Sequence, residues 1–285
     1  IYEAYYHGYE ASSPQALASA TKSLTSILVG QAIKRGAIDG VDDKVADYVP
    51  RLNRMGSPFS EITIADLLDM RSGIKSDIGL SLNTQSEFGA YTKENLIRIV
   101  FENLKREKPR GTFEYSNFEY LLLGMAIDGR KNKSARALHD GLQVPLGAEF
   151  DLIWNTDDNG FLHYEGGAVM AAPDLAKVGQ MMLDGGEVAG MPLISRAWHA
   201  RSTGFKRDIQ FDSENGPQIQ FQNGWRQVLR PHGPPDYFAA GDLGQFLYVS
   251  PSHNVVIVRN GFSYGHIPFK DWIVVFYNAA TRLDH

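Results

Sequence analysis

The feature that most constrains the fold is an apolar segment near the start of the chain. Residues 24–33 read Leu-Thr-Ser-Ile-Leu-Val-Gly-Gln-Ala-Ile and would place apolar side chains around most of a helix. A helix that is apolar on several sides has to be covered by other elements rather than lie on a surface. Gly36 stands where such a helix commonly ends. We therefore expect the chain to fold around this helix, with its N-terminal end opening into a cleft between layers.

The segments around this helix predict an α/β (α+β) fold. The aromatic-rich residues 1–9 predict a first strand. The middle of the chain has helical spacing, whereas later segments carry strand signals, including a probable hairpin over 246–258. We predict a discontinuous α/β domain with an antiparallel sheet, made of residues 1–40 and 160–285, interrupted by a helical domain at 41–159.

The composition excludes several classes of function. The 285 residues can bury the core of one large domain or two interlocked ones. A net charge of −5 without a basic stripe argues against a nucleic-acid partner. The absence of cysteine excludes disulfides, thiolate metal sites and a cysteine nucleophile. The eight histidines are scattered, so we expect no metal and no cofactor.

The sequence indicates little about location and assembly. No apolar run approaches the roughly 18 residues of a membrane helix, so no membrane-spanning segment is expected. A soluble protein without cysteine tolerates either the cytoplasm or the periplasm. The chain opens abruptly at Ile1, which leaves room for a removed segment or further strands before it. The oligomeric state is not indicated.

Ser19 and Lys22 stand three residues apart at the head of the apolar helix. Residues at this spacing share a helix face, so the Lys22 amine can lie beside the Ser19 hydroxyl. A serine hydroxyl becomes a good nucleophile when a neighbouring base takes its proton, and a neutral lysine can do that. About one Ser-x-x-Lys is expected by chance in such a chain, and a second one occurs at residues 72–75. Because Ser72 ends a helix and precedes a glycine, we predict a turn there.

Tyr115-Ser116-Asn117 forms a second element. A tyrosine near a lysine cation can ionise below its usual pKa of about 10 and shuttle a proton. Asn117 can offer its side-chain amide to a substrate carbonyl. The alternative is a buried tyrosine followed by an asparagine turn.

Gly241 and Asp242, after Ala239 and Ala240, form the third element, just before a strand. A glycine in a strand pattern often marks the close approach of a ligand to the backbone. A strand edge here could aim a backbone N–H at the same point as the Ser19 N–H, forming an oxyanion hole. The alternative is a plain β-bulge.

In this order and spacing, the three elements resemble the motifs of the penicillin-recognising serine hydrolases. The nearer resemblance is to the class C β-lactamase-like family, in its carboxylesterase and 6-aminohexanoate-dimer hydrolase-like branch. It implies a β-lactamase/transpeptidase-like fold and acyl transfer through Ser19, with Lys22 and Tyr115 as general base and acid. It also implies an oxyanion hole made by the backbone N–H groups of Ser19 and Asp242.

One departure narrows the substrate that the resemblance implies. β-Lactamases and DD-peptidases carry Lys-Thr-Gly on the third-motif strand, where this chain has Ala239-Ala240-Gly241. We therefore expect hydrolysis of a small carboxylic ester or amide, with a β-lactamase or D-specific peptidase as the alternative and a non-catalytic sensor or binding relative as a further one. Trp225 and Tyr237 are candidates to line the substrate pocket, with ordinary core packing as their alternative.

Overall fold

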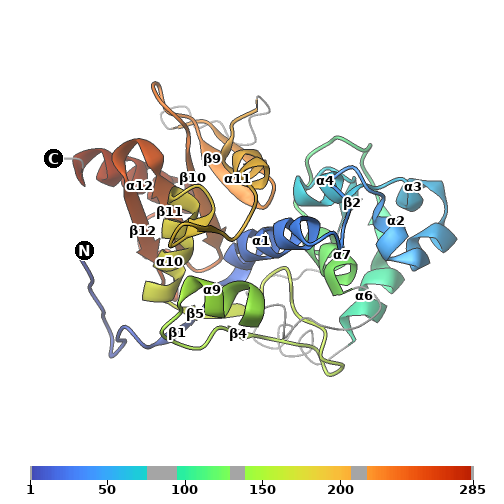
Figure 1. Ribbon diagram of the computed structural model, residues 1–285, viewed down its shortest axis with the longest axis horizontal. Coiled ribbons are helices and arrows are strands. Elements are labelled where there is room, and N and C mark those ends of the chain that lie inside the picture. Colours follow the sequence, from blue (N-terminus) through green and yellow to red (C-terminus); the bar gives the residue numbers. More distant parts are fainter. Residues whose placement is uncertain (1, 76–94, 129–138, 207–216, 284–285) are drawn as a thin grey trace.

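Helix α1 (Thr21–Lys34) crosses the middle of the molecule (Figure 1). The structure is a computed structural model that describes residues 2–75, 95–128, 139–206 and 217–283. All residues of α1 from Thr21 to Ala32 are buried, and Gly36 follows the helix with a φ of +68°. The predicted buried central helix is confirmed.

A five-stranded antiparallel sheet stands on one side of α1, with the strand order β12-β11-β10-β9-β8. Its strands are β8 (Ile219–Gln222), β9 (Trp225–Val228), β10 (Asp236–Gly241), β11 (Gln245–Ser250) and β12 (Val255–Arg259). β11 and β12 pair from Phe246 with Arg259 to Ser250 with Val255, so the predicted hairpin is confirmed.

The alternation of side chains in β10 divides the sheet between two cores. Phe238 and Ala240 pack in a smaller cluster with Ile273 of α12 (Phe269–Leu283). Tyr237 and Ala239 point the other way, into the large core that contains the apolar residues of α1. Successive residues of a strand point to opposite faces, so one strand joins the terminal helix to the centre of the molecule.

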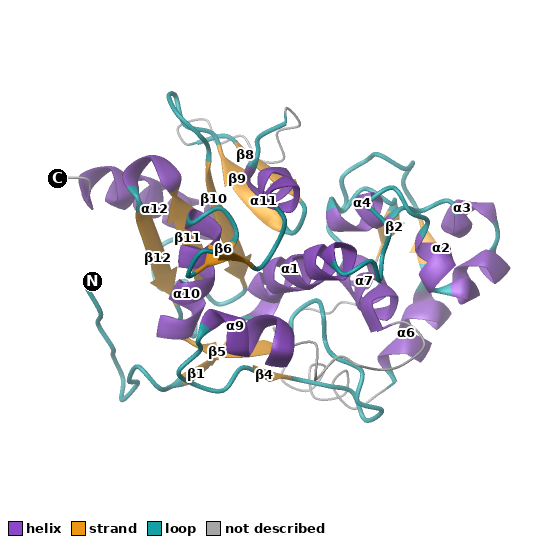
Figure 2. Cartoon of the chain, in the orientation of Figure 1, coloured by secondary structure: helices purple, strands orange, loops and turns teal. Residues whose placement is uncertain are grey.

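Short helices gather on the other side of α1, as Figure 2 shows. They are α2 (Val45–Tyr48), α3 (Ser57–Ser60), α4 (Ile64–Leu68), α6 (Leu96–Asn103) and α7 (Asn117–Asp128). α4 begins with a capping box, in which Thr63 accepts from the Asp66 N–H and Asp66 accepts from the Thr63 N–H. The predicted fold class is confirmed, whereas the domain boundaries at residues 41 and 159 stay a prediction.

A three-stranded sheet supports the start of α1. It has the order β1-β5-β4 and consists of β1 (Pro14–Ala16), β4 (Ile153–Trp154) and β5 (Ala168–Ala171). The prediction of a strand over residues 1–9 is wrong, because the described residues 2–9 form no strand and Tyr2 is 88% exposed. Aromatic residues favour strands only where a partner strand and a packing surface exist.

The remaining elements connect these layers. They are the β-strands β2 (Ile74–Lys75), β3 (Lys105–Arg106), β6 (Glu187–Val188) and β7 (Met191–Pro192), the α-helices α9 (Val144–Leu146), α10 (Ala172–Leu183) and α11 (Arg196–Thr203), a π-helical turn at His139–Gln143 and 3-10 turns at Pro50–Met55 and Pro251–His253. Among the helices of the described ranges, none is both long enough and apolar enough to cross a membrane.

Candidate active site

Ser19 lies at the junction between β1 and α1. It sits in the middle of a short 3-10 helix, Ala18–Ala20, rather than in the α-helix that begins at Thr21. Ala18 has a φ of +46°, a left-handed conformation that is uncommon for a residue with a Cβ. Backbone N–H groups in the first turn of a helix have no partner within the helix. The half-buried Ser19 is thus set at a sharp turn with its N–H available.

Lys22 faces Ser19 from the first turn of α1. Its Nζ donates to the Ser19 Oγ at 3.1 Å and to the Glu165 carbonyl oxygen at 2.7 Å. The side chain is almost fully buried, with 1% of the residue exposed. The structure therefore brings these two predicted site residues into direct contact.

The segment before β5 fixes this face of α1 through its backbone. Thr25 Oγ1 donates to the Tyr164 carbonyl at 2.6 Å, and Thr21 Oγ1 accepts from the Ala168 N–H at 3.1 Å. The Glu165 carbonyl that holds Lys22 lies between them. The sequence analysis missed this role of Glu165, because a backbone acceptor has no side-chain signature.

Tyr115 completes the cluster from the loop before α7. Its ring centroid lies 4.9 Å from the Lys22 Nζ. Although 38% of the residue is exposed, burial of the hydroxyl acts to raise its pKa. The positive charges of Lys22 and Arg226, with hydrogen bonds from Lys22 and Ser19, outweigh burial and lower the pKa of Tyr115 below 10.0. The same two charges would stabilise a tyrosinate relative to the neutral phenol.

Asn117 is the first residue of α7, two positions after Tyr115. Its Oδ1 is buried and, within the part of the chain that the structure describes, has no hydrogen-bond partner. The sequence therefore keeps Asn117 close to Tyr115, and its buried Oδ1 is an unused polar atom among the described residues.

Gly241, at the end of β10, lies directly against the Ser19 turn. A Cβ on Gly241 would stand 2.1 Å from the Leu17 carbonyl oxygen and 3.0 Å from the Ser19 nitrogen. Such contacts are too close for any side chain, so glycine is required here by the approach of the two backbones. Asp242 follows on the surface, where the Tyr264 hydroxyl is 3.5 Å from its Oδ1. The expected meeting of the third element with Ser19 is present.

Trp225 and Tyr237 require a correction. Trp225 is 0% and Tyr237 1% exposed, and their rings make an edge-to-face contact with centroids 5.9 Å apart. The Tyr237 hydroxyl donates to the Met182 carbonyl at 2.8 Å. Side chains without accessible surface cannot line a pocket, so the placement of these two residues at the substrate is wrong for this structure.

Arg226 is a residue near the site that the sequence analysis did not single out. It lies on β9, opposite Phe238 of β10, and its guanidinium carbon is 6.0 Å from the Tyr115 ring centroid. The available signal was an arginine within a strand of otherwise uncharged residues. Its approach to Tyr115 depends on strand register and on the loop before α7, which the sequence does not reveal.

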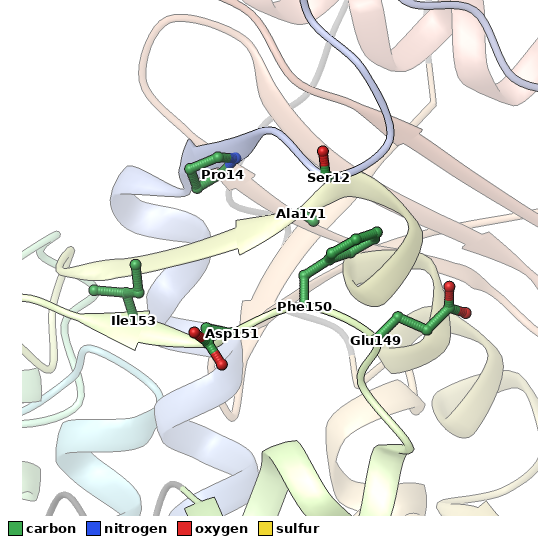
Figure 3. A pocket seen from close by; sticks show the side chains of 7 residues that line it. All are labelled: Ser12, Pro14, Glu149, Phe150, Asp151, Ile153 and Ala171. Atoms are coloured by element: carbon green, nitrogen blue, oxygen red, sulfur yellow. The ribbon is translucent and has the colours of Figure 1, made fainter.

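A separate pocket of about 400 Å³ lies along the three-stranded sheet (Figure 3). Its lining comes from β1, β4, β5 and the segment before β4, and includes Glu149, Phe150 and Asp151. Ser19, Lys22 and Tyr115 do not line it. The pocket is therefore distinct from the cluster around Ser19. In the described ranges, no three histidine or carboxylate side chains are grouped so as to hold a metal ion.

Comparison with known proteins shows the family of the chain. The family model described as Beta-lactamase matches residues 1–263. A 6-aminohexanoate-dimer hydrolase of Paenarthrobacter ureafaciens is 27% identical over 272 residues, which are 90% of this chain and 68% of that protein.

Solved structures share the fold. A Bacillus anthracis protein assigned as a 6-aminohexanoate-dimer hydrolase superposes with a TM-score of 0.83 at 22% identity, covering 100% of this chain and 76% of that one. A class C β-lactamase of Rhodobacter sphaeroides gives a TM-score of 0.68 at 18% identity, covering 96% and 86%. The predicted β-lactamase/transpeptidase-like fold is confirmed.

Proposed function

The chain belongs to the Beta-lactamase family and is a serine hydrolase, and we propose that it cleaves small carboxylic esters or amides through an acyl-enzyme on Ser19. The observation that carries the proposal is the contact between the Lys22 Nζ and the Ser19 Oγ at 3.1 Å, with Tyr115 beside both.

In the first step, the Ser19 Oγ attacks the substrate carbonyl carbon and passes its proton to the Tyr115 oxygen. The Lys22 ammonium beside them favours the tyrosinate and holds the serine oxygen in place. The carbonyl π-electrons move to the oxygen, which the backbone N–H groups of Ser19 and Asp242 would bind. The close packing of Gly241 on the Ser19 turn supports this assignment.

In the second step, the tetrahedral intermediate collapses and the bond to the leaving alcohol or amine breaks. Tyr115 returns its proton to that leaving group, which leaves an acyl ester on Ser19. Water then attacks the ester while Tyr115 accepts a proton from it, and collapse returns the proton to Ser19 and releases the acid. Asn117 would position the substrate by donating from its side-chain amide nitrogen to a substrate carbonyl.

The substrate class is supported by what β10 carries next to this site. Ala239 and Ala240 precede Gly241 and are both buried, so this strand supplies no cation. Among relatives, the 6-aminohexanoate-dimer hydrolase is similar over most of this chain. These observations favour a small ester or amide over a β-lactam.

The deciding experiment labels the protein with a fluorophosphonate probe and identifies the modified residue by peptide mass spectrometry. We expect one adduct, on Ser19, and turnover of p-nitrophenyl butyrate that Ser19→Ala abolishes. Ser72→Ala is the matched control and should keep both labelling and turnover. An adduct on another residue, or full turnover by Ser19→Ala, would overturn the proposal.

Three further outcomes would favour the alternatives. Nitrocefin turnover faster than ester turnover would indicate a β-lactamase. Penicillin trapped stably on Ser19 would indicate a D-specific peptidase. Absence of labelling and of turnover in a folded protein would favour a sensor or binding relative.

A further inference from the structure

Arg226 is a half-buried cation that lies among aromatic rings. Its Nε is buried and has no hydrogen-bond partner, and the described residues include no ion pair to its guanidinium. Its surroundings are aromatic: the guanidinium carbon lies 5.4 Å from the Phe221 ring centroid and 5.9 Å from that of Phe238. Aromatic faces attract a guanidinium, but they leave its N–H donors unused.

Two other partly or fully buried arginines are bound to carboxylates, whereas the partly buried Arg259 donates to the Gly244 and Ser263 carbonyls. Arg230 donates from Nε to the Asp236 Oδ2 at 2.7 Å, and Arg201 forms an ion pair with Asp69 at 2.8 Å. A charge removed from water without a partner is costly, so buried cations are normally paired. Among the described residues, the Arg226 guanidinium donates to neither a carboxylate nor a carbonyl, although it borders Tyr115.

The position of Arg226 connects it to the proposed chemistry. The Tyr115 ring centroid lies 4.9 Å from the Lys22 Nζ and 6.0 Å from the Arg226 guanidinium carbon, so both cations border the same tyrosine. Lys22 is occupied by Ser19 and by the Glu165 carbonyl. Arg226 makes no such contacts, and its positive charge also acts on Tyr264, which lies beside Asp242. A substrate with its carbonyl at Ser19 would extend past Tyr115 towards this guanidinium.

We propose that Arg226 binds a carboxylate of the substrate and so selects esters or amides that carry an acidic group about one aromatic ring away from the scissile carbonyl. This inference rests on the proposed function of Ser19. A guanidinium offers two parallel N–H donors to a carboxylate, and this geometry gives direction as well as attraction. Arg226 is thus a specificity-determining residue, supplied by β9 where β10 carries no cation.

The test compares two esters with the same leaving group, p-nitrophenyl butyrate and p-nitrophenyl hydrogen glutarate. The readout is the ratio of their kcat/KM values within each variant, since any effect of Arg226 on Tyr115 changes both esters and cancels. The native protein should prefer the glutarate ester, and Arg226→Gln should lower the ratio by about 10- to 100-fold, the range of one hydrogen-bonded charged partner. The ratio for Arg226→Lys should lie between these two values, because lysine keeps the charge but lacks the two parallel N–H donors of the guanidinium.

Arg196→Gln is the matched control, because it removes an arginine that is 92% exposed on α11. This variant should keep the native ratio of the two kcat/KM values. Because it changes the net charge as Arg226→Gln does, it separates recognition at Arg226 from the effect of net charge. A native ratio near one, or an Arg226→Gln ratio equal to that of the native protein, would overturn the inference. A role limited to packing against Phe221 and Phe238 predicts the second of these results.

A binding measurement distinguishes this inference from the proposed function. Calorimetric titration of monomethyl glutarate into the Ser19→Ala variant measures binding without acylation. In the double variant that also carries Arg226→Gln, the Kd should be at least about tenfold higher. If neither ester is hydrolysed while this Arg226-dependent binding is present, the proposed function fails and the carboxylate site stands. If esters are hydrolysed at Ser19 but binding does not depend on Arg226, the carboxylate site fails alone.

Discussion

The two Ser-x-x-Lys sequences of this protein adopt different structures. Ser19 and Lys22 lie on consecutive helical turns, and the Lys22 Nζ reaches the Ser19 Oγ at 3.1 Å. Ser72 lies in the turn region that follows α4, which ends at Leu68, and Lys75 lies in β2, with Gly73 between them at a φ of +81°. The extended backbone after Gly73 carries Lys75 away from Ser72.

The neighbours of the two pairs differ as much as the backbone does. The Ser72 hydroxyl is fully buried and donates to the Glu119 carboxyl, while Lys75 forms an exposed ion pair with Glu107 at 3.1 Å. In contrast, Ser19 and Lys22 stand beside Tyr115 and the end of β10. A shared motif therefore supports the same chemistry only where the backbone is helical and the partners converge on it.

Replacing the two serines should give the largest contrast. We expect Ser19→Ala to lower kcat/KM for p-nitrophenyl butyrate by about 10⁴-fold or more, because it removes the proposed nucleophile. Ser72→Ala should keep that value within about threefold. It should instead lower stability by about 1–3 kcal/mol, because a buried carboxyl loses its donor. The thermal midpoint should then fall by about 2–4 °C per kcal/mol. Equal loss of activity in both variants would contradict the distinction.

Replacing the two lysines should give the next largest difference. Lys22→Met should lower kcat by about 10²- to 10⁴-fold, since the charge beside Ser19 and Tyr115 is lost. Lys75→Met removes half of an exposed ion pair, which contributes about 0–1 kcal/mol, so activity and thermal midpoint should stay near those of the native protein. Steady-state kinetics and calorimetry on both variants test this pair. Near-native turnover by Lys22→Met would remove the lysine from the proposed mechanism.

A smaller effect is expected from Tyr115→Phe, about 10²- to 10³-fold in kcat. Burial opposes ionisation of Tyr115, but the Lys22 and Arg226 charges lower its pKa below 10.0. In the proposed mechanism the tyrosinate accepts the proton of Ser19, so native kcat/KM should rise with pH through that pKa. This rise in kcat/KM should be missing from the pH profile of Tyr115→Phe measured between pH 6 and 10. An unchanged rise in the variant would assign it to another group.

Much of the fold could be predicted from the sequence, because it depends on local periodicity. The apolar circumference of 24–33 required a buried helix, and the alternation over 246–258 required a hairpin. The strand predicted at 1–9 failed because propensity does not specify a partner. The sequence also suggests that the loop at 75–92 contributes to substrate specificity, but its residues after Lys75 lie outside the described ranges.

The site was predictable only where side-chain spacing encodes it. Ser19 and Lys22 are adjacent along one helix face, so their contact followed from the three-residue spacing together with the predicted helix. The Glu165 carbonyl is a backbone group, and Arg226 approaches Tyr115 through cross-strand register, so neither left a local pattern. Trp225 carries the same aromatic signal in a core as in a pocket, and the structure buries it.

The smallest predicted effect concerns Glu119, the buried carboxyl that accepts a hydrogen bond from the Ser72 hydroxyl in the second Ser-x-x-Lys sequence. Burial, together with the nearby Asp66 and Asp69, raises the pKa of this carboxyl well above 4.5 and outweighs the hydrogen bonds from Ser72. A pKa raised in the folded state stabilises the protein fully below the unfolded pKa of about 4.3, and this stabilisation is lost as the pH rises through the folded pKa. Between the two values, the loss is up to about 1.4 kcal/mol per pH unit.

Glu119→Gln stays neutral at every pH and can still accept the Ser72 hydroxyl hydrogen bond. The thermal midpoint of the variant should therefore rise relative to that of the native protein as the pH increases above about 4.3. Ester turnover at pH 7 should change less than about threefold, because Glu119 contacts Ser72 and not Ser19. Midpoints that run parallel from pH 4 to 9 would show that the buried carboxyl is not neutral when folded. Loss of turnover without loss of stability would instead connect the second Ser-x-x-Lys to catalysis, against the separation of the two motifs.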